Sequence, residues 1–208
     1  MILVGQYDSP YTRRVAISLM VLGIPYEHDT RSVFGDFDSM RTTNPLGRIP
    51  SFILDDGEVL IDSAAILDHL DEMAGLERAL LPPSGKARRD ALQRIALANG
   101  AVDKIGGGVN YERLIRPSRY RWPEWIRRCT TQGLGALAAL DALEWPRDGI
   151  DQAQITTACA FDYIQVTAPN DFAPRGRYPR LDALADRLRK RPEFRATSFS
   201  DYAIPHAD

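Results

Sequence analysis

The N-terminal residues combine a short apolar run, a serine–proline pair and an apolar helix pattern. Residues 1–4 (MILV) predict a strand, and residues 9–15 (SPYTRRV) predict the start of a helix. Ser9 suits the N-cap, and Pro10, with its fixed φ and missing N–H, suits the first helical position. The free N–H groups at such a start favour an anion, and a serine hydroxyl can donate one hydrogen bond to it. The segment therefore predicts either a plain helix cap or a site for an anion such as a thiolate.

A second pattern, further along the chain, predicts a hairpin followed by a helix. Residues 51–54 and 58–61 are short β-rich runs, and the Asp-Gly pair between them is a strong hairpin signal. Pro50 stands just before the first strand, where it breaks no ladder bond and where a cis peptide bond is least costly. Asp62 and Ser63 then begin a helix, since apolar residues follow at helical spacing up to a terminating glycine at position 75.

These motifs resemble those of the soluble glutathione transferases, and the resemblance covers nearly the whole chain. In that family a strand–turn–helix carries the thiol-activating residue, a cis-proline precedes the hairpin, and an acidic residue or Gln followed by Ser begins the third helix. Ser9, Pro50, Asp62 and Ser63 stand in these places in the same order. The resemblance implies an α/β N-terminal thioredoxin-like domain plus an all-α C-terminal domain.

Residues 9–12 (SPYT) are similar to the Cys-Pro-Tyr-Cys of glutaredoxins and the Cys-Pro-Phe of omega-class transferases, with Ser9 in place of the reactive cysteine. A serine cannot form a mixed disulfide with glutathione, so thiol transfer is disfavoured and conjugation is favoured. The pattern is closest to that of small bacterial transferases of the serine type. Ser9 is then expected to act as a hydrogen-bond donor to the thiolate and not as a covalent nucleophile. Tyr7 is the rival, because tyrosine-using transferases place a phenol in this region.

The resemblance also implies the other contacts with glutathione. The backbone of Ile49, before Pro50, would pair with the cysteinyl unit in the manner of an added strand. Ser63 would hold the γ-glutamyl carboxylate and Asp62 the α-ammonium group, although the two residues are also a good helix start by themselves. Arg48 would meet the glycyl carboxylate.

In the family that the chain resembles, the first turn, the following loop and the helical domain line the second-substrate pocket, so the resemblance nominates Tyr11, Phe34 and Tyr111 by their location. The implied activity is conjugation of the glutathione thiolate to a small, electrophilic, hydrophobic substrate, with glutathione as co-substrate and no other cofactor. A glutathione-dependent isomerase, a dehalogenase and a non-catalytic binding or regulatory protein remain as alternatives. The Ser-Ser-Cys run of maleylacetoacetate isomerases reads Ser9-Pro10-Tyr11 here, which disfavours that isomerase.

Residues 81–85 (LPPSG) predict a linker between a first domain of residues 1–80 and a second domain of residues 86–208. Strand patterns end at this point. Helices are predicted over residues 86–105, 109–115, 123–143, from a capping box at 151 through 164, and over 178–194. Three consecutive glycines at 106–108 predict a kink or break, because glycine is unfavourable inside a helix.

The composition is that of an ordinary globular protein: 208 residues, 44% hydrophobic, with a net charge of −2. No apolar stretch approaches the length of a membrane helix and no basic leader begins the chain, so we expect a cytoplasmic protein with no membrane partner. The arginines of residues 113–128 and 175–191 are interleaved with acidic residues, so ion pairs are expected there in place of nucleic-acid binding. An arginine that faces the cleft and steers an anionic second substrate is the alternative. The resemblance implies a homodimer.

The metal-binding residue types do not form a site in the sequence. Cys129 and Cys159 lack metal-type spacing, and His28, His69 and His206 are scattered along the chain. We therefore expect no metal centre and two buried thiols.

Overall fold

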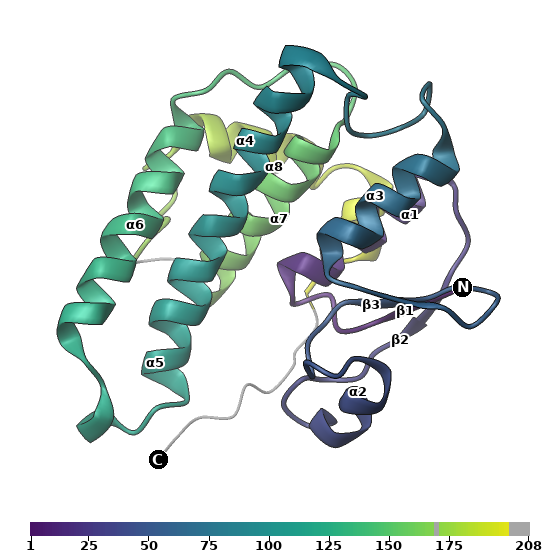
Figure 1. Cartoon of the computed structure of the whole chain (residues 1–208). Helices are drawn as coiled ribbons and strands as arrows, with labels where there is room; N and C mark the ends of the chain where they lie inside the picture. Colours follow the sequence, from purple (N-terminus) through teal and green to yellow (C-terminus); the bar gives the residue numbers. More distant parts are fainter. Residues whose placement is uncertain (169–170, 200–208) are drawn as a thin grey trace.

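The computed structural model describes residues 1–168 and 171–199 as a small sheet beside a bundle of helices (Figure 1). The N-terminal elements are β1 (Ile2–Val4), α1 (Pro10–Leu22), β2 (Glu27–Asp29), α2 (Phe37–Thr43), β3 (Ser51–Ile53), β4 (Val59–Ile61) and α3 (Ser63–Ala74). The later elements are α4 (Gly85–Val102), a π-helix (Asp103–Asn110), α5 (Tyr111–Leu114), a 3₁₀ helix (Ser118–Tyr120), α6 (Pro123–Asp141), α7 (Gln152–Thr167), α8 (Pro179–Leu188) and α9 (Pro192–Ala196). The predicted α/β and all-α domains are both present, while His206 lies outside the described residues.

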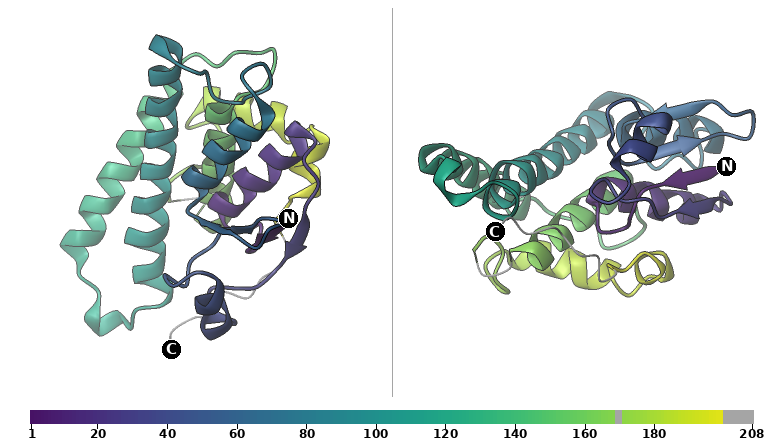
Figure 2. Two further views of the ribbon diagram at one scale, coloured as in Figure 1. Left: turned by 45° about the vertical axis from the view of Figure 1, so that its right-hand side comes forward. Right: turned by 90° about the horizontal axis from the view of Figure 1, so that it is seen from below.

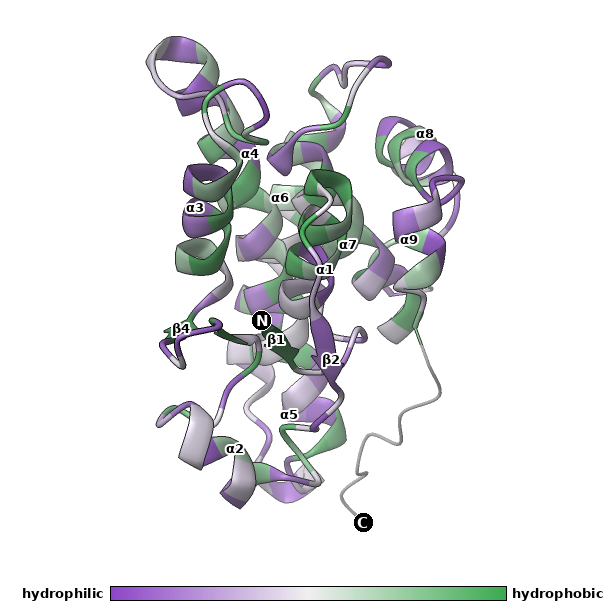
Figure 3. Cartoon of the chain, turned by 90° about the vertical axis from the view of Figure 1, so that its right-hand side faces the viewer, coloured by the Kyte–Doolittle hydropathy of each residue, from purple (hydrophilic) through white to green (hydrophobic). Residues whose placement is uncertain are grey.

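The sheet has the strand order β2-β1-β3-β4, with β1 parallel to β2 and antiparallel to β3. The predicted hairpin is present, and Phe52 of β3 lies opposite Leu60 of β4. β1 is hydrophobic and lies inside the sheet, whereas β2 is a hydrophilic edge strand (Figure 3). The sequence pattern predicts no strand at β2, because its three polar residues lack apolar alternation.

Two helices of the N-terminal domain begin as predicted. Ser9 is the N-cap of α1, and its side chain accepts a hydrogen bond from the backbone N–H of Thr12. Asp62 is the N-cap of α3, and Gly75 ends that helix. α1 packs against α3 within its own domain and against α7 of the helical domain, so the two domains meet along α1.

The predicted kink or break at residues 106–108 is correct only in part: the regular α-helix ends at Val102 and a π-helix spans Asp103–Asn110, but the chain stays helical from α4 into α5. The glycines instead permit close packing. A Cβ on Gly108 would lie 2.6 Å from Sγ of Cys129 on α6, and a Cβ on Gly106 would lie 3.0 Å from the hydroxyl of Tyr163 on α7. The penalty that glycine carries in a helix is thus offset by contacts that any side chain would block.

We expect Gly108→Ala to lower the free energy of unfolding by about 1–3 kcal/mol, because the new methyl group would overlap the buried Cys129. Gly107→Ala is the matched control, since a Cβ there meets no atom within 4 Å. That control should keep the wild-type stability or gain up to about 1 kcal/mol from helix propensity. Urea unfolding of both variants measures the difference. Equal stabilities would contradict the close contact with α6.

Helix α7 joins the cores of the two domains. It begins with the predicted capping box between Asp151 and Gln154. Cys159 packs in a core shared with the sheet and α1, whereas Phe161 packs in a second core between α4, α6 and α8. The two views in Figure 2 show α7 between the α4–α6 pair and the N-terminal domain. This central place explains why polar as well as apolar residues of α7 are buried.

Other helical elements also differ from the sequence prediction. The predicted helix of residues 178–194 is two helices, because α8 ends at Leu188 and Pro192 begins α9. Proline suits a first helical position, so it starts a new helix after stopping the old one. No helix is predicted at α2, where Met40 is the only buried residue and no apolar period is visible.

Two expectations from the sequence, buried thiols and ion pairs of the helical-domain arginines, hold within the described part of the chain. Cys129 and Cys159 are buried free thiols. Arg113 pairs with Asp171 and Arg116 with Glu112, as expected for arginines of the helical domain. Residues 1–168 and 171–199 contain no cluster of side chains that would hold a metal ion, and none of their helices is long and apolar enough to cross a membrane. The division at residues 81–85 remains a prediction.

Candidate functional site

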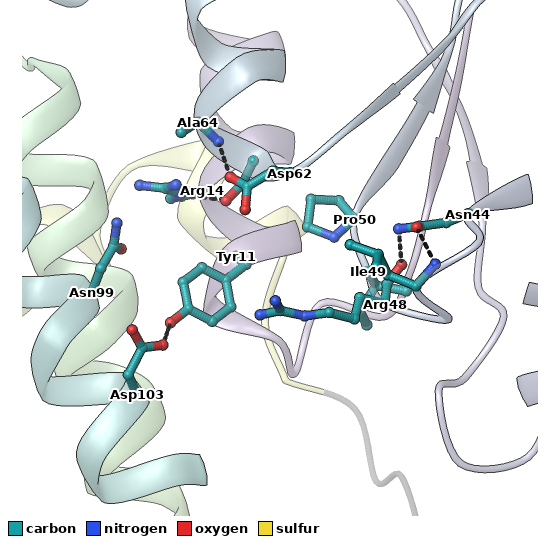
Figure 4. A pocket seen from close by; sticks show the side chains of 12 residues that line it. Tyr11, Arg14, Asn44, Arg48, Ile49, Pro50, Asp62, Ala64, Asn99 and Asp103 are labelled. Carbon is teal, nitrogen blue, oxygen red and sulfur yellow. Dashed lines mark hydrogen bonds between the residues drawn. The ribbon is translucent and has the colours of Figure 1, made fainter. Parts of the chain in front are cut away.

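Two adjoining cavities lie between the N-terminal domain and the α4–π-helix segment. The first has a volume of about 250 Å³ and many polar groups in its wall, and the second has a volume of about 400 Å³ and more apolar walls. Tyr11, Arg48, Ile49 and Asp103 line both cavities. The two cavities are therefore compartments of one cleft, whose polar part is shown in Figure 4.

The loop before β3 forms one wall of the polar cavity. The Ile49–Pro50 peptide bond is cis, as expected, and both residues line the cavity (Figure 4). The side chain of the buried Asn44 donates to the carbonyl of Arg48 over 2.8 Å and accepts from the N–H of Leu46 over 3.0 Å. These bonds hold the loop in a shape that presents Ile49 and Pro50 to the cleft.

The start of α3 forms the second wall. Asp62 has a φ of 68°, and it is the only residue other than glycine with a positive φ in the described ranges. Its carboxylate accepts from the N–H of Ala64 over 2.8 Å. Non-glycine residues in this conformation are strained, and such strain tends to occur at functional sites. The buried Ser63 follows, and both residues line the polar cavity.

A buried arginine of α1 contacts Ser63 at the start of α3. Arg14 of α1 is buried, and its guanidinium donates two hydrogen bonds of 2.6 and 3.2 Å to Oγ of Ser63. Burial lowers the pKa of Arg14, and the nearby Tyr11 and Asp62 oppose that shift. Because Ser63 Oγ accepts from Arg14, its own proton is free to be donated to a ligand. The arrangement suits an anionic group at the N-terminus of α3.

Ser9 lines the second cavity at the N-terminus of α1. Its Oγ accepts from the N–H of Thr12 over 3.4 Å, which leaves the hydroxyl proton available for a ligand. Tyr7 lies elsewhere: its hydroxyl is 2.8 Å from the hydroxyl of Tyr26, and its ring stacks on His28 at 3.9 Å. Ser9 and not Tyr7 is thus among the residues that line the cleft.

Tyr11 stands where the two cavities meet. Its hydroxyl donates to the carboxylate of Asp103, the first residue of the π-helix (Figure 4). Burial, and then this hydrogen bond, raise the pKa of Tyr11, so its phenol stays protonated. The guanidinium carbon of Arg14 lies 5.8 Å from the Tyr11 ring centroid. Tyr11 therefore joins α1 to the helical domain across the cleft.

The second cavity brings together the three residues nominated for it. Tyr11, Phe34 and Tyr111 all line it. The rings of Phe34 and Tyr111 meet edge to face, with centroids 5.8 Å apart. Gly106 and Gly107 of the π-helix supply a wall without side chains. An apolar ligand of small size fits such a space.

The sequence and the fold match those of known proteins. Residues 3–78 match the family model described as glutathione S-transferase, N-terminal domain. A glutathione transferase family member from Pseudomonas fluorescens Pf-5, solved with bound glutathione, is 32% identical with a TM-score of 0.84, and the match covers 96% of this chain and 98% of that one. The chain belongs to the glutathione S-transferase family.

Two curated relatives show the range of the similarity within this family. The uncharacterized GST-like protein YibF of Escherichia coli K12 is 29% identical over 210 residues, which covers 94% of this chain and 96% of the relative. Maleylacetoacetate isomerase of Pseudomonas aeruginosa PAO1 is 35% identical over 148 residues, which covers 64% of this chain and 66% of the relative.

Several residues in the cleft of this glutathione S-transferase family member are not predicted from the sequence, among them Arg14, Asn99, Asp103 and Tyr163. Asn99 and Asp103 are four positions apart, so they share one helix face, which the pattern of α4 alone does not assign to a cleft. The sequence could have indicated Arg14, because a charged residue inside an apolar helix needs a buried partner.

Proposed function

We propose that the protein is a glutathione S-transferase that joins the thiolate of glutathione to a small, largely apolar electrophile. The cleft carries this proposal: a polar compartment with partners for both ends of a zwitterionic tripeptide opens, beside Ser9, into a more apolar compartment. The Pseudomonas fluorescens transferase that binds glutathione supports the identity of the first substrate.

Glutathione is proposed to lie in the polar cavity with its γ-glutamyl group at the start of α3. Ser63, supported by Arg14, donates to the γ-glutamyl carboxylate, and Asp62 faces the α-ammonium group. The Ile49 backbone pairs with the cysteinyl unit beside cis-Pro50, as in strand addition. Arg48 meets the glycyl carboxylate.

The chemistry then requires ionisation of the thiol. A free thiol has a pKa of about 8.5, so only a few per cent is thiolate at neutral pH. The Ser9 hydroxyl and the N-terminus of α1 stabilise the anion, and the released proton goes to solvent. The thiolate attacks a carbon of the electrophile in the second cavity, and a C–S bond forms. In a substitution the bond to the leaving group breaks, and the leaving group takes the electron pair. In an addition a π electron pair of the electrophile moves to a neighbouring atom, which then takes up a proton from solvent.

The test is a glutathione-binding measurement by calorimetry followed by turnover with a panel of electrophiles. Binding with release of a conjugate supports the proposal. Binding without turnover of any electrophile contradicts it and favours a regulatory or binding role. Release of halide with regeneration of free glutathione would identify a dehalogenase.

A glutathione-dependent isomerase is the second candidate, because of the 35% identity to the Pseudomonas aeruginosa isomerase. Isomerisation returns glutathione unchanged, so consumption of glutathione distinguishes conjugation from it. The Ser9-Pro10-Tyr11 run, in place of Ser-Ser-Cys, favours conjugation.

We expect Asp62→Asn and Ser63→Ala to raise the KM for glutathione about tenfold at nearly constant kcat, because each loses a charge-assisted contact far from the sulfur. Asparagine keeps the helix cap, so Asp62→Asn isolates the charge. Steady-state kinetics with glutathione varied at fixed electrophile measures the effect. Asp151→Asn, at the capping box of α7, is the control and should leave KM unchanged. An unchanged KM in both site variants would show that Asp62 and Ser63 only begin helix α3 and do not bind glutathione.

The proposal has three further parts: the oligomeric state, the location in the cell and the physiological role. Assembly as a homodimer, a cytoplasmic location and a role in detoxification stay predictions. Analytical ultracentrifugation of the full chain tests the first of them.

A further inference from the structure

The connection between α5 and α6 carries a group of exposed aromatic side chains. It forms one end of the α4–α6 helix pair, the lower end in Figure 1. Tyr120 and Trp122 are both 61% exposed, and Ile115 and Trp125 are exposed as well. Single exposed apolar residues are ordinary, whereas a group of them indicates a contact surface. Neither of the two cavities is lined by these residues, so the cleft gives no account of them.

The same segment is strongly basic. Residues 113–128, the aromatic tip, contain six arginines and one glutamate, although the whole chain has a net charge of −2. Half of these arginines pair with an acidic residue, namely Arg113, Arg116 and Arg127. The other half form no ion pair within residues 1–168 and 171–199, namely Arg119, Arg121 and Arg128. The tip therefore has a local excess of positive charge, which attracts an anionic partner.

Cations and aromatic rings are interleaved at the tip. The guanidinium carbon of Arg119 lies 4.6 Å from the ring centroid of Tyr120, and Nζ of Lys104 lies 5.7 Å from that of Trp125. Arg121 donates to two backbone carbonyl groups beside α5 over 2.6 and 2.9 Å, which fixes the shape of the connection. The tip thus offers apolar surface and positive charge together on a defined backbone.

This combination suits a lipid surface better than a protein or a nucleic acid. Trp and Tyr rings are favoured at the level of the lipid headgroups, and arginine can lay its stem along apolar groups while its charge stays in the polar layer. A stable protein interface buries about 800 Å² on each partner and needs a complementary shape. Single-stranded nucleic acid is bound along a positively charged groove, whereas the tip is the end of a helix pair. A fluid lipid surface adapts to such an end and needs no matching shape.

We propose that the aromatic tip binds the surface of membranes that contain anionic lipids. Tyr120 and Trp122 enter the headgroup layer, and Arg119 and Arg128 lie among the anionic headgroups. The expectation of no membrane partner rests on the lack of a spanning segment, and a surface contact needs none. The contact is reversible and sensitive to salt, because few side chains take part and the attraction between charges is screened. It does not depend on the proposed transferase function.

The experiment measures binding of the full chain to lipid vesicles by sedimentation. Vesicles of phosphatidylcholine with about one quarter phosphatidylserine are compared with vesicles of phosphatidylcholine alone. We expect at least about tenfold stronger binding to the anionic vesicles at low salt, and loss of most of this difference at about 0.5 M salt. Tryptophan emission should move to shorter wavelength on binding, because two of the three tryptophans of the chain lie in the tip.

Trp122→Ala tests the aromatic part of the contact. It should lower the partition coefficient for anionic vesicles about tenfold and reduce the shift in emission, because the indole no longer enters the headgroup layer. Leu76→Ala is the control, since Leu76 is 80% exposed and lies outside the tip. It should bind as the wild type does.

A double variant, Arg119→Gln with Arg128→Gln, tests the charge. The partition coefficient should fall about 10- to 30-fold, because each arginine near an anionic lipid surface contributes about fivefold. Arg89→Gln with Arg147→Gln is the matched control, since it removes the same charge from two exposed arginines outside the tip. It should bind nearly as tightly as the wild type.

Three results would overturn the proposal. The first is no binding of the wild type to anionic vesicles at low salt. The second is an equal loss in the two double variants, which would show attraction by the charge of the whole chain. The third is binding to DNA or to polyglutamate as tight as to the anionic vesicles and with the same dependence on Trp122, which would identify a nucleic acid or an acidic protein as the partner.

Discussion

Asp162→Asn is expected to lower the free energy of unfolding by about 3–5 kcal/mol, because it removes one partner of a buried charge network. One carboxylate oxygen of Asp162 accepts from Arg13 of α1 over 2.6 Å, and the other accepts from Arg189 over 2.9 and 2.6 Å. The side chains of Arg13 and Asp162 are only 3% and 4% exposed. The neutral amide would leave the Arg13 charge buried with no counter-ion at this position.

Asp162 lies on α7 of the helical domain and pairs with Arg13 of the N-terminal domain, so the expected loss of stability tests how strongly this pair joins the two domains. Arg13 lies on α1 of the N-terminal domain and also donates to the carbonyl of Phe194 on α9 over 3.3 Å. Urea unfolding followed by circular dichroism measures the effect in the full chain. Asp171→Asn is the control: it breaks an ion pair with Arg113 whose side chains are 42% and 53% exposed, and it should cost less than about 1 kcal/mol. Similar small losses in both variants would show that the network contributes little.

Ser9→Ala is expected to raise the pKa of enzyme-bound glutathione by roughly one to two units, because a hydrogen bond to a charged group contributes about 1.5–3 kcal/mol. The sign follows from the state that is stabilised: the hydroxyl donates to the thiolate, so its loss favours the thiol. If the pKa returns from about 6.5–7.5 to the free value of about 8.5, the thiolate fraction at neutral pH, and with it kcat/KM, should fall about 8- to 25-fold. Glutathione affinity should change only several-fold, since the other contacts remain.

The thiolate absorbance of the complex, titrated against pH, measures this shift directly. Ser9→Thr keeps a hydroxyl and a helix cap and should restore most of the low pKa. Tyr7→Phe is the second control, because Tyr7 lies against Tyr26 and His28 outside the cleft, and its titration should match the wild type. A shift in Tyr7→Phe with none in Ser9→Ala would transfer the role to Tyr7. The loss of the N-cap in Ser9→Ala should lower the free energy of unfolding by about 1 kcal/mol, too little to explain a large loss of rate.

Much of the site follows from residues that are adjacent in the chain. The caps at Ser9 and Asp62, the hairpin and the proline before it depend on local backbone preferences, so a single sequence suffices to predict them. The nomination of Tyr11, Phe34 and Tyr111 came from the family resemblance, and the structure places all three in one cavity. The role of each in binding or chemistry remains a proposal.

Other parts depend on distant residues that meet only in the fold. Arg14 reaches Ser63 across 49 positions, Tyr11 reaches Asp103 across 92, and Arg13 reaches Asp162 across 149. The glycines at 106–108 show the same dependence, because their local preference predicts a break while packing against Cys129 and Tyr163 keeps the segment helical. The sequence by itself determined where the cleft-forming helices begin, since capping and turn formation are local. Tertiary packing alone decided which side chains share the cleft and how the domains are held, because those contacts exist only once both cores have formed.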